Sequence, residues 1–163
     1  MVSHQYAHSQ QGALLIEVLV AILIFSVGIL GLVGLQASAV KASTDAKYRS
    51  EASLLVNALI GRMWVSNRTQ ATLQAAFAGG TGGSDGASYT QWTQGANANP
   101  PTAGSVFQVL PGAQSNPPTV VITAIAPGVA ASQPSSLVTV TLFWRAPSET
   151  VLHSYVAVVQ VGG

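Results

Sequence analysis

Glu17 is the residue whose position in this sequence most strongly suggests chemistry. It is the only charged side chain in residues 13–35, a run of 23 residues in which Ser26 carries the only other polar group. As a helix, this run reaches roughly 34 Å, enough to cross a bilayer core of about 30 Å. An acid costs about 3 kcal/mol at the middle of a membrane and less near its edge. The sequence therefore predicts a membrane span that contains a functional carboxylate.

The other titratable residues form no pattern typical of catalysis. The chain has five acids and three histidines, and His153 is the only histidine beyond the first 12 residues. There is no Ser/His/Asp order, metal-ligand spacing or pair of carboxylates, so we expect neither enzymatic activity nor a metal or cofactor. The absence of cysteine excludes a disulfide framework. A charged fraction of 7% and a net charge of +1 also argue against nucleic acid as a partner.

Glu17 also stands at a fixed distance from Gly12. The short polar segment 1–12 ends in Gly12, Ala13 opens the apolar run, and Glu17 is the fifth residue of that run. This arrangement resembles the class III signal peptide of type IV pilins and type II secretion pseudopilins. The resemblance implies cleavage after Gly12 by a prepilin peptidase on the cytoplasmic face, N-methylation of Ala13, and retention of the apolar run as an assembly helix. It also implies that Glu17 pairs with the α-amino group of a neighbouring subunit and so fixes the axial register.

Two other interpretations of the N-terminus are an ordinary signal anchor and a secretory signal peptide. The second fits poorly, because the apolar run exceeds the roughly 7–15 residues of such a signal and no basic segment precedes it. The leader departs from the pilin pattern in having no Lys or Arg, and the first basic residues after the span are Lys41, Lys47 and Arg49. Charge counting alone would favour the opposite orientation. The cleavage motif instead predicts that the domain after the span is periplasmic.

Two features after Glu17 bear on which subgroup of pilin-like proteins the sequence resembles. Glycines recur at Gly28, Gly31 and Gly34, which is consistent with close helix packing, with a segment that can loosen, or with simple tolerance of glycine in membrane helices. Residues 62–68, with Arg-Met followed by Asn-Arg, are similar to a pattern of PilV-type pilus modification proteins, which are minor pilins. With the cleavage motif, these matches cover roughly the first 70 residues.

The span is followed by a segment with helical character. Residues 36–68 contain no proline and are rich in Ala, Leu, Lys, Arg and Glu. Five residues at helical spacing form a stripe on one face: Tyr48, Ala52, Leu55, Leu59 and Met63. We therefore predict that the helix continues to about residue 70 and packs this stripe against a sheet.

The rest of the chain is expected to form loops and then strands. Residues 78–104 are rich in Gly, Asn and Pro and are predicted as a loop region, with Tyr89 and Trp92 as anchors. A sheet is predicted over residues 105–163, with four strand-like runs at 105–110, 119–125, 137–145 and 151–161. The third run alternates Val138, Val140, Leu142 and Trp144 with outward residues, as in a half-buried antiparallel strand. The predicted class is α+β, a long N-terminal helix packed on a C-terminal antiparallel β-sheet.

The predicted function is that of a minor pilin-like structural subunit that enters or primes a type IV pilus. Its domains would be the leader (1–12), the transmembrane and assembly helix (13–35) and a periplasmic pilin-like domain (36–163). Its partners would be the prepilin peptidase, other pilin subunits, the inner-membrane assembly machinery and the lipid bilayer. It would cross the bacterial inner membrane once and then enter the filament at the cell surface. A minor pseudopilin of a type II secretion system and an uncleaved, membrane-tethered binding domain are the alternatives.

Overall fold

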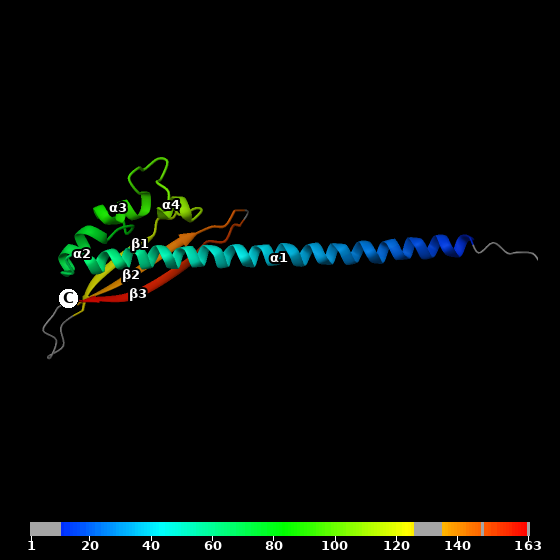
Figure 1. Cartoon of the computed structure of the whole chain (residues 1–163), viewed down its shortest axis with the longest axis horizontal. Helices are drawn as coiled ribbons and strands as arrows, with labels where there is room; N and C mark the ends of the chain where they lie inside the picture. The colour runs from blue at the N-terminus through cyan, green and yellow to red at the C-terminus, as the bar shows by residue number, and fades with distance from the viewer. Residues whose placement is uncertain (1–10, 126–134, 148, 163) are drawn as a thin grey trace, which may run out of the picture. The chain divides into compact units, whose positions relative to one another are not determined.

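The computed structural model describes residues 11–125, 135–147 and 149–162. Its elements are given in chain order (Figure 1): α1 (Gln11–Val65), α2 (Gln70–Phe77), α3 (Ala87–Gln94), α4 (Val106–Val109), β1 (Thr119–Ile125), β2 (Ser135–Trp144) and β3 (His153–Gly162). This is an α+β arrangement, as predicted. The chain divides into two compact units, Met1–Ser43 and Thr44–Gly163.

The described part of the first unit is the N-terminal portion of α1. No proline occurs between residues 11 and 65, so nothing in the sequence forces a break in the helix. All side chains from residue 12 to residue 43 are exposed, including large ones such as Phe25 and Leu30. By length and composition, α1 is suited to cross a membrane. The predicted long apolar N-terminal helix is therefore confirmed.

In the second unit, the same helix becomes amphipathic. Ala52, Leu59 and Met63 are fully buried, Leu55 is buried, and Tyr48 packs against the core from its edge. These are the residues of the predicted stripe. Their burial removes apolar surface from water, which contributes about 25 cal/mol per Å². The stripe thus fixes the second half of α1 to the core of the unit.

The sheet has the order β1-β2-β3 and is antiparallel throughout. In β2, the inward side chains Val138, Val140, Leu142 and Trp144 are all inaccessible to solvent, and Val140 lies opposite Val120 and Ala157. The predicted alternation is therefore confirmed. In β3, the side of the strand that starts with His153 is the more buried one.

The prediction of a strand at residues 105–110 is wrong, because this segment contains the short helix α4. Val106 and Leu110 are fully buried and stand four residues apart, which places them on one face of a helical turn. The backbone carbonyl of Ser105 accepts hydrogen bonds from the amides of Gln108 and Val109, at 3.1 and 3.0 Å. The described residues therefore form three strands rather than the four predicted.

The predicted loop region 78–104 contains the helix α3. Its Ser and Thr side chains can compete for backbone hydrogen bonds, which lowers the preference of this segment for a helix. Two buried aromatic residues hold it in place, as expected of the anchors. Trp92 Nε1–H donates to the carbonyl of Leu55 on α1 at 3.0 Å, and Tyr89 Oη–H donates to the carbonyl of Pro118 at 2.6 Å. α3 is thus stabilised by tertiary contacts rather than by its own sequence.

The glycines before α3 are explained by close packing against Tyr89. A Cβ on Gly79 would lie 2.5 Å from the ring of Tyr89, and Gly80 has a φ of +73° with the carbonyl oxygen of Pro118 only 2.0 Å from such a Cβ. Gly79 also exchanges two backbone hydrogen bonds with Val120, at 3.2 and 3.0 Å. The glycine-rich segment is therefore a packed connection to β1.

The shorter helices are neighbours in space. α2 borders α3, α3 borders α4, and α2 also contacts β1 (Figure 1). α1 ends at Val65, so the predicted helix to residue 70 is interrupted before α2 begins. At this break, the Ser66 hydroxyl donates to the carbonyl of Met63 at 2.8 Å, and the Thr69 amide donates to Asn67 Oδ1 at 3.0 Å. Polar side chains thus satisfy backbone groups where the helix stops.

Candidate functional site

The predicted processing residues lie at the start of α1. Gly12 and Ala13 are helical and follow directly on Gln11, where the described chain begins, so positions 1–10 of the predicted leader lie outside the described residues. A Cβ added to Gly12 would meet no atom within 4 Å. Packing within the chain therefore gives no reason for a glycine here.

Glu17 lies on the same helix and has no partner among the described residues. Among the described residues, its carboxylate makes neither a hydrogen bond nor an ion pair. Ser26, the other polar residue of the run, donates to the carbonyl of Ile22 at 2.7 Å and is satisfied within the helix. The two polar groups of the apolar run thus differ. Only the carboxylate lacks a partner among the described residues.

The glycines of the apolar run are equally unexplained by contacts within the chain. Gly28, Gly31 and Gly34 are all helical, and a Cβ on any of them would meet no atom within 4 Å. Each costs a helix about 1 kcal/mol relative to alanine. The chain's own packing does not account for them, and the three interpretations given above remain predictions.

A second cluster of titratable groups was missed by the sequence interpretation, which treated the histidines and acids as scattered. His153 Nε2 lies 2.6 Å from Glu149 Oε2, and its Nδ1 lies 3.2 Å from Asp45 Oδ1. The ring stacks on Trp144 with centroids 5.7 Å apart and planes at 14°. The cluster thus joins α1, the β2–β3 connection and both strands of the hairpin.

Part of this cluster could have been found from the sequence. Trp144 and His153 are direct partners in the β2–β3 register, and the runs predicted at 137–145 and 151–161 are separated by only five residues. Asp45 gave no such signal, because it lies far away in the sequence on a helix whose rotation relative to the hairpin was unknown. Only the packed fold brings it to the ring.

The geometry of the cluster is that of a structural contact between α1 and the hairpin, which we call the tie. Asp45 Oδ1 is shielded from water and has no hydrogen bond of good geometry among the described residues, which leaves His153 Nδ1 as its nearest donor group. An imidazole with protons on both nitrogens can donate to both carboxylates, whereas a neutral ring can donate to one. No group of three or more His, Cys, Asp or Glu in the described part of the chain could hold a metal ion.

The pKa of Tyr89 is raised, mainly because burial disfavours the phenolate and secondarily because Asp85 is nearby. This tyrosine therefore serves as a neutral donor to Pro118. It is a packing group with a satisfied hydroxyl rather than a candidate acid or base.

No family model, curated protein or solved structure matches this chain. The similarity to pilins therefore stands on the residues of the N-terminal motif and of segment 62–68.

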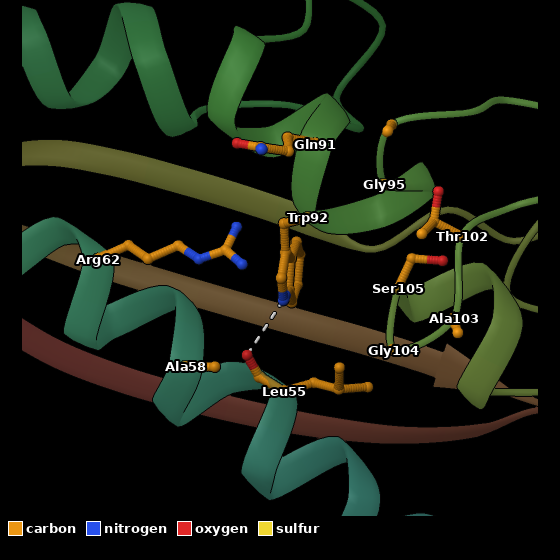
Figure 2. Close-up of a pocket in the computed structure, with 11 residues that line it drawn as sticks. Leu55, Ala58, Arg62, Gln91, Trp92, Gly95, Thr102, Ala103, Gly104 and Ser105 are labelled. Atoms are coloured by element: carbon orange, nitrogen blue, oxygen red, sulfur yellow. Dashed lines mark hydrogen bonds between the residues drawn. The ribbon is translucent and has the colours of Figure 1, made fainter.

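The second unit also contains a hollow between α1, α3 and the loop that follows α3 (Figure 2). Its volume is about 310 Å³, and Arg62 is the only charged residue that lines it. Trp92 lies at its centre in this view, with Arg62 on one side and Thr102, Ala103 and Gly104 on the other. The sequence interpretation included Arg62 only as part of the pattern in residues 62–68.

Proposed function

We propose that this chain is a minor pilin-like subunit that is cut after Gly12 by a prepilin peptidase and then enters or primes a type IV pilus. The observation that carries the proposal is the environment of the Glu17 carboxylate. It is the only charge in a fully exposed apolar run, and it has no partner among the described residues. A group of this kind is expected where a second copy or a related chain completes the environment.

In a filament, apolar helices would bundle and exclude water from the carboxylate. An unpaired carboxylate in such a place is costly, because transfer out of water disfavours its charged form. Cleavage after Gly12 creates a cation, the α-amino group of Ala13, on every subunit. Pairing of Glu17 with the amine of a neighbour would satisfy both charges. Such a pair contributes a defined axial register more than it contributes stability.

The structure of the second unit is consistent with a subunit that carries a separate, exposed domain. It has its own core, formed by the stripe on α1, the inward side of the sheet and the aromatic anchors of α3. In the proposed orientation, this unit lies in the periplasm of a bacterial cell while the apolar run lies in the inner membrane. After assembly, the unit would form part of the filament surface.

A minor pseudopilin of a type II secretion system has the same N-terminal features. We favour the pilus because residues 62–68 resemble the pattern of pilus modification proteins. The membrane-tethered domain differs from both, because it keeps its leader and needs no partner for Glu17.

The mass of the intact protein, purified from membranes, tests the proposal. We expect a chain that has lost residues 1–12 and gained one methyl group on Ala13. The same measurement in cells that lack prepilin peptidase should return the full precursor and serves as the control. A full-length mass in cells that contain the peptidase would contradict both filament functions and leave the tethered domain.

A further inference from the structure

The hollow of the second unit has the features of a binding site for one acidic side chain. It is walled by α1 on one side and by α3 and the loop after it on the other (Figure 2). The loop is fixed by backbone hydrogen bonds from Thr102 to Gln94, at 2.9 Å, and from Ser105 to Thr102, at 3.1 Å. The hollow is therefore preformed rather than created by an open chain segment.

Arg62 gives the hollow a positive charge that no described residue neutralises through an ion pair. None of the lining residues is acidic. In the part of the chain that the structure describes, the Arg62 guanidinium makes no ion pair or hydrogen bond. In Figure 2, its side chain extends from α1 toward Trp92. A guanidinium presents five N–H donors in a planar fork that matches a carboxylate.

Other polar groups of the hollow are also available to a ligand. Gln91 is exposed and lies on the same wall as Trp92. The backbone amides of Ala103 and Gly104 have no partner among the described residues. Gly104 has a φ of +83° and open space where a Cβ would stand, so a ligand can approach its backbone closely. Together these groups offer donors around an apolar wall formed by Trp92 and Leu55.

We propose that this hollow binds a glutamate or aspartate side chain presented by another protein chain. Its volume of about 310 Å³ is at the lower limit for sites that enclose a whole small molecule, roughly 300–1,000 Å³. Several lining residues, among them Ala58, Arg62 and Ala103, are exposed, so the site can receive a side chain from a neighbouring surface. Trp92 and Leu55 would contact the apolar residues beside the acid. The site does not depend on filament formation and would exist equally in a tethered domain.

Binding can be measured on the full chain in detergent micelles by NMR, through the indole N–H signal of Trp92. The probes are N-acetylglutamate, its uncharged analogue N-acetylglutamine, and a short capped peptide with one glutamate between leucines. We expect the glutamate to shift the Trp92 signal at concentrations at least tenfold lower than the glutamine does. The peptide should bind at least tenfold more tightly than free N-acetylglutamate.

Two substitutions separate the site from general charge effects. Arg62→Gln should weaken binding of the peptide at least tenfold, because it removes the only charge of the hollow. Arg49→Gln removes the same charge from an exposed position on the same helix and should leave binding unchanged. Ala58→Leu fills the hollow without changing its charge and should also weaken binding.

The possible results distinguish the proposal from its rivals. Equal binding of glutamate and glutamine, or an equal loss in Arg62→Gln and Arg49→Gln, would overturn the carboxylate site. Equal binding of the peptide and free N-acetylglutamate would show a site for small carboxylates and overturn the protein partner. None of these results depends on cleavage after Gly12, so the proposed function can fail while this site stands.

Discussion

The two units of this chain satisfy their polar groups in opposite ways. In the first unit, residues 12–43 are exposed throughout, and Glu17 has no partner among the described residues. In the second unit, the carboxylates of Asp45 and Glu149 both contact the ring of His153. The side chains of Trp92 and Tyr89 donate hydrogen bonds to backbone carbonyls. One continuous helix takes part in both. Among the described residues, the second unit thus pairs these polar groups within itself, whereas the first leaves Glu17 without a partner.

The largest expected effect tests whether another molecule recognises the start of α1. Gly12→Leu should abolish cleavage and leave the precursor in the membrane, because a peptidase that accepts this site must fit a residue with almost no side chain. The chain's own packing leaves space for the larger residue, so folding should be unaffected. The mass of the intact protein measures the outcome, and Gly12→Ala should still be cut at least in part. A chain that starts at Ala13 in the Gly12→Leu variant would refute the cleavage assignment.

The next effect separates the two polar groups of the apolar run. Glu17→Leu should still insert and be cut after Gly12, but it should be lost at least tenfold from sheared filaments, because the amine of the neighbour stays unpaired. Glu17→Gln should give a partial loss, since an amide can accept a hydrogen bond but cannot neutralise a cation. Quantitative blots of membrane and filament fractions measure both.

Ser26→Ala is the matched control for this comparison. Its hydroxyl is already satisfied by Ile22, so its removal should leave filament incorporation at the wild-type level. Wild-type recovery of Glu17→Leu in filaments would instead show that the carboxylate is merely tolerated near the membrane edge.

In the second unit, a pair of adjacent leucines on α1 tests the internal contacts. Leu55 is buried in the core, whereas Leu54 is 61% exposed. Leu55→Asp should unfold the unit, because an unpaired buried carboxylate costs several kcal/mol against a total stability of about 5–15 kcal/mol. Leu54→Asp should change stability by less than about 1 kcal/mol. Thermal unfolding of the full chain in micelles, followed by near-ultraviolet circular dichroism, measures both. Equal stability of the two variants would mean that this face of α1 is not packed.

The smallest expected effect concerns Tyr89. Its raised pKa means that the folded unit disfavours the phenolate, so its contribution to stability is fully present below the unfolded value of about 10 and is lost as the pH rises above it. Tyr89→Phe should cost about 1 kcal/mol at pH 7 through the lost hydrogen bond. It should also make the unfolding temperature less sensitive to pH between about 10 and 12. Parallel curves for the two proteins over that range would contradict the assigned burial effect.

Long periodic patterns were sufficient to predict much of the fold. The stripe on α1 and the alternation in β2 follow directly from burial on one face, and β1 was predicted with both of its bounds. α4 was not predicted, because in a run as short as residues 105–110 the spacing of Val106 and Leu110 fits a helical turn as well as one face of a strand. α3 was missed because its stability comes from Tyr89 and Trp92 packing on distant segments.

The sites divide in the same way. Gly12, Ala13 and Glu17 are close together in the sequence, so the family resemblance could be stated from their spacing, and their roles remain predictions. The contact of Asp45 with His153 and the hollow at Arg62 depend on how α1 rotates against the hairpin and α3. No local pattern contains that information.

The tie between Asp45 and His153 also has a mechanical consequence. Asp45 lies near the start of the second unit, so a force that pulls on the apolar part of α1 reaches this contact before it reaches the stripe that begins at Tyr48. Because His153 opens β3 and stacks on the last residue of β2, the tie passes that load into two paired strands at once. Under tension, we expect the helix and the hairpin to yield together, so that His153→Ala lowers the unfolding force in single-molecule pulling while Arg145→Ala, an exposed neighbour, leaves it unchanged. The contact between Asp45 and His153 would thus couple the start of the packed part of α1 mechanically to the hairpin.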